Sequence, residues 1–178
     1  DPNFIYSLIA KEGDIDCEEG TFFDDAMKVL QTYGCKKMFL PNQTSCNSAI
    51  SDRSKSYGKP YRINTFYIPD ENFYTSSTNE KTNTIKNVIA EKTPVIIGAS
   101  TTASIAPLGS ENGSVTNNGL WDPKDYEKVD GGHAMCVIGY DDYKFGGAFE
   151  IMNSWGSDYG DNGFNWIKYD DFFRLTQE

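Results

Sequence analysis

The chain has 178 residues, of which 38% are hydrophobic and 14% aromatic, a composition too apolar for an intrinsically disordered protein. Its formal net charge of −10 at pH 7 argues against nucleic acids and anionic membrane surfaces as partners, because both are polyanions that bind basic surfaces. The longest apolar runs, such as Pro94–Ala99, are too short to cross a bilayer, so we expect no membrane span.

The N-terminal part of the chain is predicted to be helical. Phe4–Ala10 is a short apolar run that predicts one or two helical turns. Thr21–Tyr33 has apolar residues at helical spacing, with Thr21 as its predicted N-cap and Gly34 as its stop. Cys35–Lys59 is rich in Ser, Asn, Lys and Pro and is predicted to be mostly loop.

The middle of the chain alternates between predicted strands and a helix. Tyr61–Ile68 alternates in part and is rich in β-formers, which predicts a strand. Glu80–Lys92 has the apolar spacing of a helix, and Pro94–Ala99 follows it as a predicted buried strand. Residues 100–130 hold many Ser, Thr, Asn and Gly, which predicts a long surface excursion.

The C-terminal part is predicted to be rich in strands, namely Ala134–Tyr140, Ala148–Asn153 and Phe164–Lys168. Helices come first and strands later, which favours an α+β fold over a doubly wound sheet. A boundary between two lobes is expected near residues 60 to 69.

The four cysteines leave several states open. Cys35 and Cys46 lie in a predicted loop, and a bridge between them is one pairing open to a secreted protein. Cys136 lies in an apolar strand and is expected to be a small buried hydrophobe. No two cysteines have the spacing of a zinc ribbon, and no metal is expected. Because the chain opens at Asp1 without Met or a leader, we expect it to begin inside a longer gene product.

The only histidine, His133, follows two glycines and opens an apolar run. A lone histidine is more often structural than catalytic. In this chain, however, Asn153 and Trp155 follow about 20 residues after it, at the end of another apolar strand. A cysteine nucleophile needs an imidazole as its base. That imidazole needs a side chain such as an amide to hold its tautomer and ring plane, and an indole can shield the contact from water. The two motifs together therefore indicate a hydrolytic site.

The motifs Gly132-His133-Ala134, Gly139-Tyr140-Asp141, Asn153-Ser154-Trp155-Gly156 and Gly160–Phe164 together resemble the C-terminal half of papain-family cysteine peptidases. The similarity is strong from about Gly131 to Phe164 and weaker before, and the acidic, Asn-rich character is more like bacterial members. It implies a papain-like fold of two lobes, incomplete in this chain. Residues 1–66 would belong to the helical lobe and residues 67–178 to the β-barrel-like lobe.

The resemblance also implies roles for individual residues. His133 would be the general base and ion-pair partner of the nucleophile, Asn153 would orient it, and Trp155 would cover their contact. The family needs no metal or organic cofactor. The substrate-binding residues that the resemblance implies are Gly20, Thr21, Phe22 and Gly132.

The nucleophile of the family has no counterpart in this chain. It lies roughly 130–150 residues before the histidine, and counting back from His133 reaches no cysteine. Cys17 is a poor substitute, because Glu18 and Glu19 would raise the pKa of its thiol. The chain is then one piece of a two-chain enzyme, a truncated piece of a larger enzyme, or a nucleophile-less relative. We expect an N-terminal chain or segment to carry the cysteine and to cover the otherwise exposed apolar side chains of Phe4, Ile5, Phe22 and Phe23.

The function predicted from these observations is hydrolysis of peptide bonds in proteins or peptides, with a secreted or cell-envelope location. A non-catalytic peptide-binding or regulatory module on the same fold is the alternative. A transglutaminase-like acyl transferase is disfavoured, because such enzymes use Asp where this chain has Asn153. The acidic residues between 122 and 130 are expected to form a solvated loop, and Asp158–Gly163 lacks the terminal Glu of an EF-hand.

Overall fold

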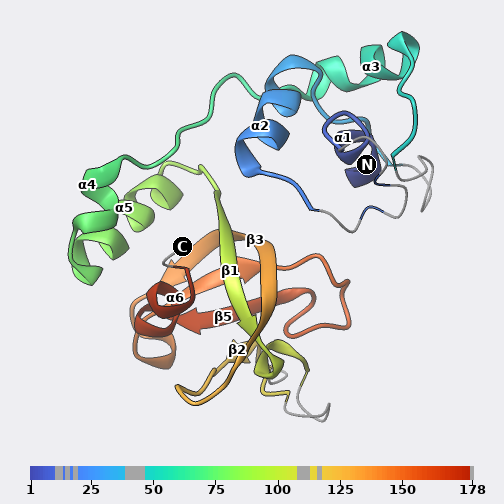
Figure 1. Cartoon of the computed structure of the whole chain (residues 1–178). Helices are drawn as coiled ribbons and strands as arrows, with labels where there is room; N and C mark the ends of the chain where they lie inside the picture. The colour runs from blue at the N-terminus through green and yellow to red at the C-terminus, as the bar shows by residue number, and fades with distance from the viewer. Residues whose placement is uncertain are drawn as a thin grey trace. The chain divides into compact units, whose positions relative to one another are not determined.

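The computed structural model describes residues 1–10, 14, 17, 20–38, 47–107, 113–115 and 118–176. They form two compact units, Asp1–Ile68 and Pro69–Glu178 (Figure 1). Helices make up the regular structure described in the first unit, and the second unit combines helices with a five-stranded sheet. The predicted α+β class is therefore confirmed, although the sheet is open and does not close into a barrel.

The first unit is built from short helices: α1 (Pro2–Tyr6), α2 (Phe23–Thr32), α3 (Asp52–Gly58) and the 3-10 turn η1 (Lys59–Tyr61). Phe4 of α1 is fully buried, and α1 packs against α2. Gly34, which follows α2, has a φ of +74° and touches Gly58, where an added Cβ would lie 2.0 Å from the Gly58 carbonyl oxygen. Only glycine meets both demands, so α2 ends there.

The helix predicted over Thr21–Tyr33 forms, but its N-terminus differs from the prediction. The helix begins at Phe23, and Phe22 is its N-cap with no side-chain hydrogen bond to the helix, so the prediction that Thr21 caps it is wrong. Phe22 is 73% exposed, whereas Val29 is buried. The cap position lies outside the helical repeat, so the period that places Val29 does not apply to Phe22.

One other prediction for the first unit is wrong, and another is incomplete. The described residues of Cys35–Lys59 are loop except for α3 and the first residue of η1, and α3 is capped by Ser51 Oγ, which accepts the Ser54 N–H at 3.2 Å. Tyr61–Ile68 forms no strand, and most of its residues are exposed. A run of β-formers becomes a strand only when a neighbouring strand pairs with it, and these residues pair with none of the described strands.

The second unit is organised by a sheet in the order β1-β3-β4-β5-β2. The strands are β1 (Val95–Thr102), β2 (Leu120–Trp121), β3 (Val129–Asp141), β4 (Ala148–Met152) and β5 (Phe164–Lys168). Neighbours are antiparallel except β2 and β5. The four strands predicted for this unit form, but β1 ends three residues later and β3 begins five residues earlier than predicted.

Helices α4 (Glu71–Thr75), α5 (Thr78–Ala90) and α6 (Tyr169–Leu175) complete the second unit. The predicted helix Glu80–Lys92 is α5, which begins two residues earlier because Ser77 and Glu80 form a capping box. The core contains Phe149 of β4, which is fully buried. Its ring lies 4.8 Å from that of Phe172 in α6, between ring centroids, so α6 closes the core against the sheet.

Residues 100–130 are not simply a surface excursion. They include the 3-10 turn η2 (Ala103–Ile105) and Trp121 of β2, of which only 1% is exposed. The Trp121 Nε1–H donates to Ser104 Oγ at 3.0 Å, and Ser104 Oγ shares a second hydrogen bond with Thr102 Oγ1 at 2.8 Å. The small polar residues that predicted a loop serve here as buried partners for an indole.

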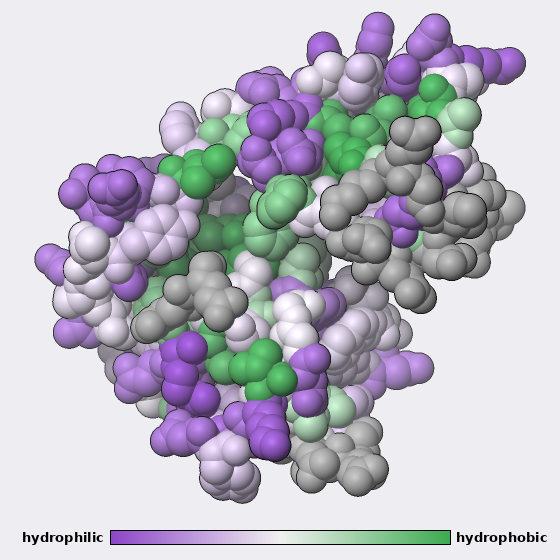
Figure 2. Space-filling view, in the orientation of Figure 1, coloured by the Kyte–Doolittle hydropathy of each residue, from purple (hydrophilic) through white to green (hydrophobic). Residues whose placement is uncertain are grey.

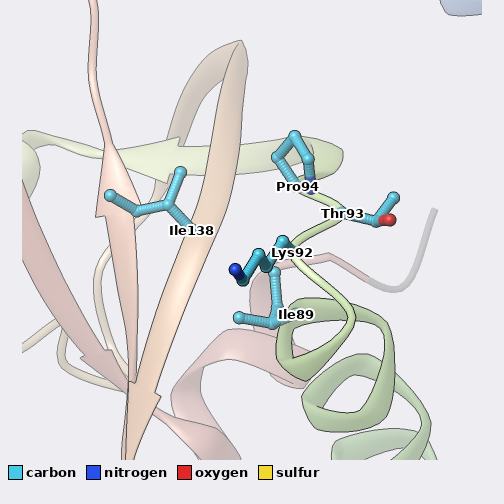
Figure 3. Close-up of a pocket in the computed structure, with 5 residues that line it drawn as sticks. All are labelled: Ile89, Lys92, Thr93, Pro94 and Ile138. Carbon is cyan, nitrogen blue, oxygen red and sulfur yellow. The ribbon is translucent and has the colours of Figure 1, made fainter.

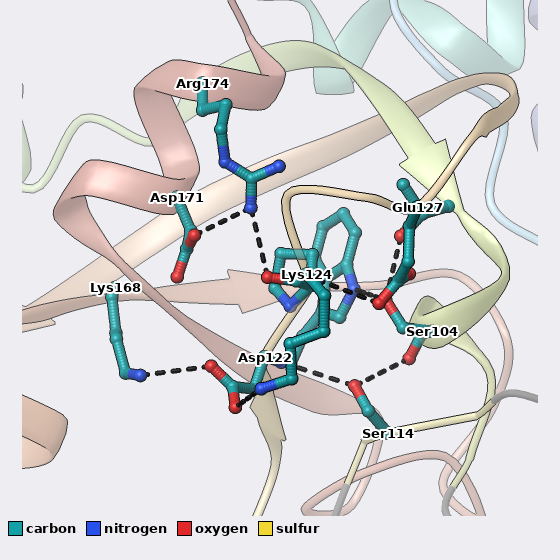
Figure 4. Close-up of polar contacts among 11 residues, drawn as sticks. Ser104, Ser114, Asp122, Lys124, Glu127, Lys168, Asp171 and Arg174 are labelled. Atoms are coloured by element: carbon teal, nitrogen blue, oxygen red, sulfur yellow. Dashed lines mark hydrogen bonds and ion pairs between the residues drawn. The ribbon is translucent and has the colours of Figure 1, made fainter.

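The loop between β2 and β3 is tied to the C-terminal elements by charged contacts (Figure 4). Asp122 pairs with Lys124 and, at 3.0 Å, with Lys168 of β5. Hydrogen bonds from Lys124 and then from Lys168 hold the pKa of the Asp122 carboxyl below its usual value. Arg174 of α6 donates to the Pro123 carbonyl oxygen at 3.1 Å. The start of the loop that follows β2 is therefore held by β5 and α6.

Asp142 is predicted to make the second unit acid-sensitive. Its carboxylate accepts hydrogen bonds from Lys86 Nζ of α5 at 2.7 Å and from the Tyr169 hydroxyl of α6 at 2.8 Å. The Lys86 contact, followed by the Tyr169 contact, lowers the pKa of Asp142. A carboxyl whose pKa is lower in the folded state stabilises the fold at pH values above its unfolded-state pKa of about 3.9. This stabilisation is lost as the pH falls through the pKa of the folded state.

We therefore expect Asp142→Asn to have a lower melting temperature than the unmodified protein at neutral pH. The difference between the two melting temperatures should become smaller as the pH falls below about 4. The effect should be small, because half of the Asp142 side chain is exposed. Thermal melts of both proteins across this pH range measure the difference, and a difference that stays constant with pH would contradict the prediction.

Candidate active site

His133 lies near the start of β3, where the strand pairs with β1 and places His133 opposite Ala99. The imidazole is half-buried, whereas the preceding Gly131 and Gly132 are exposed and have open space around the position of a Cβ. The Thr101 hydroxyl donates to the Gly131 carbonyl oxygen at 3.1 Å. The backbone before the histidine is thus anchored to β1 but remains accessible on its outer side.

Asn153 follows β4 directly, and its side chain reaches His133. The Asn153 Oδ1 lies 2.9 Å from His133 Nε2 and also accepts the Ser154 backbone N–H at 2.7 Å. A backbone N–H only donates, so the atom facing both groups is the amide oxygen rather than the amide nitrogen. His133 Nε2 must then carry the hydrogen, and the neutral imidazole keeps its lone pair on Nδ1.

Trp155 stacks on the histidine. The ring centroids of His133 and Trp155 are 4.9 Å apart, and the ring planes make an angle of 24°. Trp155 is 47% exposed, so its indole covers the imidazole on one side and meets solvent on the other. The predicted trio of histidine, amide and indole is therefore brought together by the ends of two neighbouring strands.

Tyr159 supports this trio, and the sequence reasoning missed it. Its ring packs edge-on against Trp155, with centroids 5.0 Å apart, and its hydroxyl donates to the Ile105 carbonyl oxygen at 3.1 Å. Burial raises the pKa of the Tyr159 hydroxyl to about 12, an effect that the Asn153 side chain opposes only weakly. The hydroxyl consequently remains a neutral donor at physiological pH. The sequence signal was an aromatic residue four positions after Trp155 in a glycine-flanked turn.

Tyr159→Phe tests this support. The variant keeps the ring against Trp155 but leaves the buried Ile105 carbonyl without its donor, so we expect a loss of about 1–3 kcal/mol of stability. Denaturant unfolding measures the loss. Tyr143→Phe is the matched control, because Tyr143 is 94% exposed and its hydroxyl should contribute little. Equal effects of the two substitutions would show that the Tyr159 hydroxyl does not brace the site.

The remaining predicted site residues belong to two different units. Gly132 lies next to His133 in the second unit, whereas Gly20, Thr21 and Phe22 lie in the first unit and are exposed. Gly20 has a φ of +66°, and its carbonyl oxygen accepts the Tyr6 hydroxyl at 3.4 Å. Their role in substrate binding stays a prediction.

The described cysteines differ from the pairing considered above. Cys17 takes part in a disulfide and Cys35 is a free thiol, so the bridge from Cys35 to Cys46 that the sequence left open does not form. Cys46, like Glu18 and Glu19, lies outside the described residues. Burial raises the pKa of the free Cys136 thiol, which disfavours the thiolate. Cys136 also points to the opposite face of β3 from His133, three residues away.

Other parts of the described structure offer no rival site. Among the described residues, no group of three His, Cys, Asp or Glu side chains is placed to hold a metal ion. No described helix is long and apolar enough to cross a membrane. A hollow of about 350 Å³ lies where α5 leads into β1 (Figure 3), and none of the predicted site residues lines it. Its lining residues are Ile89, Lys92, Thr93, Pro94 and Ile138.

An imidazole that a neighbouring side chain holds in one tautomer is suited to act as the base for a nucleophilic side chain. The model of the papain family of cysteine proteases matches residues 8–174 of the chain. The chain therefore belongs to the papain family of cysteine proteases, as its sequence motifs predicted.

Known proteins that are similar to the chain include a bacterial protease and a viral protein. The crystal structure of xylellain, a cysteine protease from Xylella fastidiosa, has a TM-score of 0.69 and 24% sequence identity. The match covers 94% of this chain and 62% of xylellain, and it shows the fold. An uncharacterised peptidase C1-like protein of Acanthamoeba polyphaga mimivirus is 43% identical over 51 residues, which are 28% of this chain and 16% of the viral protein. The chain thus spans less than two thirds of each relative.

Proposed function

We propose that this chain supplies the base of a papain-like cysteine peptidase that hydrolyses peptide bonds in proteins or peptides. The observation that carries the proposal is the 2.9 Å contact between His133 Nε2 and Asn153 Oδ1. This contact fixes the imidazole in the tautomer whose Nδ1 can accept a proton. Membership of the papain family supports the same reaction.

The chemistry follows from this tautomer. His133 Nδ1 takes the proton of a cysteine thiol, which gives a thiolate and an imidazolium held as an ion pair. The thiolate attacks the scissile carbonyl carbon, and the imidazolium then returns its proton to the leaving amine, so that an acyl-enzyme forms. Asn153 keeps the ring plane through both transfers. Trp155 shields the hydrogen bond to Asn153 on one side, which strengthens it in a lower local dielectric.

The nucleophile in this proposal comes from an N-terminal chain or segment outside these 178 residues. Among the described cysteines, Cys17 is in a disulfide and Cys136 is on the wrong face of β3. Cys35 is a free thiol, but it follows the C-terminus of α2 and has no helix N-terminus to support a thiolate. Exposed apolar side chains in the first unit support the presence of such a partner, because Phe22 is 73% exposed and Phe23 is 43% exposed. Phe4, which was also expected to be covered by this partner, is instead fully buried without it.

The substrate in this proposal is an extended peptide. Gly20 is exposed with no atom near the position of a Cβ, so its backbone can hydrogen-bond to a peptide chain in the manner of an added strand. Thr21, Phe22 and Gly132 are the other residues that we propose to contact the substrate. A secreted or cell-envelope location is part of the proposal and is supported by the disulfide at Cys17, since disulfides persist in oxidising compartments.

A peptidyl epoxide that alkylates active cysteines tests the proposal in the full-length protein. We expect a denaturing intact mass to show one inhibitor adduct, on a segment outside residues 1–178. We also expect His133→Ala to abolish both labelling and peptide hydrolysis. Lys128→Ala is the control, because Lys128 is exposed and directly precedes β3, and it should retain both activities. A protein that binds peptides but neither takes the label nor cleaves them would instead be the non-catalytic binding module.

A further inference from the structure

Basic side chains of this acidic protein are concentrated in one segment of the first unit, Lys28–Arg62. From Lys28 to Arg62 the sequence holds seven Lys or Arg and one acidic residue, Asp52, a formal charge of +6. The rest of the chain holds nine basic and 25 acidic residues, a formal charge of −16. At physiological salt, screening limits the reach of a charge to about 8 Å. The electrostatic potential near the cations of this segment can therefore be positive although the whole chain is negative.

Four of these seven basic side chains form no ion pair with a carboxylate of the described residues. Three pair with carboxylates, namely Lys28 with Asp24, Lys36 with Asp1 and Lys55 with Asp52. The other four, Lys37, Arg53, Lys59 and Arg62, are exposed and pair with no carboxylate among the described residues. Lys37 lies 5.1 Å from the centroid of a tyrosine ring and Arg53 donates to a tyrosine hydroxyl at 3.1 Å. Neither contact neutralises a cation.

Two of the unpaired cations line one hollow. Its volume is about 410 Å³, and its lining residues are Gln31, Lys59, Pro60, Arg62, Ile63 and Asn64. The hollow has a fixed shape, because Gln31 Nε2 donates to the Asn64 carbonyl oxygen at 3.0 Å and the Ile63 N–H donates to the Leu30 carbonyl oxygen at 3.3 Å. These bonds join the end of α2 to the segment after η1. Figure 2 shows hydrophilic residues gathered over the adjacent α3.

We propose that this basic hollow, formed by Lys59 and Arg62 with Gln31 and Asn64, binds a carboxylate-rich segment of another polypeptide. The guanidinium of Arg62 suits a carboxylate in a bidentate geometry, and the ammonium of Lys59 can take a second one nearby. The exposed amide side chain of Asn64 offers hydrogen bonds to the peptide backbone. Such a site lies outside the catalytic trio and does not depend on the proposed peptidase activity.

The charge distribution favours an acidic peptide over a nucleic acid. A nucleic acid carries a regular array of phosphates, and the rest of the chain, with a formal charge of −16, offers few cations to match it. A short acidic segment can place its carboxylates on the few unpaired cations alone. Recognition of this kind mainly accelerates encounter and selects partners by charge.

Fluorescence anisotropy of a labelled octaglutamate peptide with the full-length protein at low ionic strength tests the proposal. We expect saturable binding that weakens as salt is added. The double variant Lys59→Glu with Arg62→Glu should lose about tenfold or more in affinity. The double variant Lys92→Glu with Lys128→Glu changes the net charge equally in the second unit and should bind within about twofold of the unmodified protein. Melting temperatures confirm that both variants remain folded.

Four results would overturn the proposal. They are absence of octaglutamate binding, equal weakening by the two double variants, equal binding of an octaglutamine peptide, and tighter binding of a single-stranded octanucleotide. Equal weakening would assign the binding to net charge alone, and tighter binding of the oligonucleotide would assign the hollow to nucleic acid. Peptide hydrolysis is measured separately, so loss of the catalytic proposal leaves this test intact.

Discussion

Phe149→Ala is expected to destabilise the protein by about 3–5 kcal/mol, the range for removing a large aromatic side chain from a core. Phe149 is fully buried in β4, and its ring lies 4.6 Å from that of Tyr169 and 4.8 Å from that of Phe172, between centroids. Truncation therefore opens a cavity between the sheet and α6 and removes the contacts through which α6 closes the core. Denaturant unfolding monitored by tryptophan fluorescence measures the effect.

Tyr143→Ala is the matched control for this prediction. Tyr143 lies in the turn between β3 and β4 and is 94% exposed, so its loss should change stability by no more than about 0.5 kcal/mol. If Phe149→Ala also cost less than about 1 kcal/mol, the packing of α6 on Phe149 would not be the main closure of this core.

The strands and the catalytic trio were predictable because their signals are local. β3 contains the apolar run Ala134–Ile138, β4 is apolar except for Glu150, and β5 holds Phe164, Trp166 and Ile167. Aromatic and β-branched residues of this kind favour strands. His133 and Asn153 end up together because they lie near the ends of adjacent antiparallel strands. Their motifs specify this pairing without knowledge of any distant residue.

The residues that escaped prediction depend on distant partners. The role of Tyr159 rests on a hydrogen bond to Ile105, 54 residues earlier, and no local pattern announces it. The predicted strand Tyr61–Ile68 has the composition of a strand but finds no neighbour to pair with among the described strands. The pairing of Cys35 that the sequence left open failed for a related reason, since a disulfide requires two cysteines to meet in space and sequence spacing alone does not specify that.

Asn153→Ala carries the sharpest test of the catalytic proposal. The variant removes the acceptor that holds the hydrogen on His133 Nε2, so the imidazole is free to rotate and to exchange between its two neutral tautomers. In the full-length protein we expect kcat for peptide hydrolysis to fall by about a hundredfold to ten-thousandfold, as for loss of general-base function or of the residue that orients it. KM should change little, because Asn153 is not proposed to touch the substrate.

His133 provides a direct readout, because it is the only histidine in these 178 residues. Nitrogen-15 chemical shifts of labelled histidine distinguish a proton on Nε2 from one on Nδ1, and we expect the Nε2–H form in the unmodified protein and a mixture in Asn153→Ala. Asn83→Ala, at an exposed position of α5, is the matched amide control and should alter neither the shifts nor kcat. If the shifts of Asn153→Ala matched those of the unmodified protein, the amide would not set the tautomer. A tautomer that changes while kcat is retained would mean that His133 is oriented by Asn153 but is not the catalytic base.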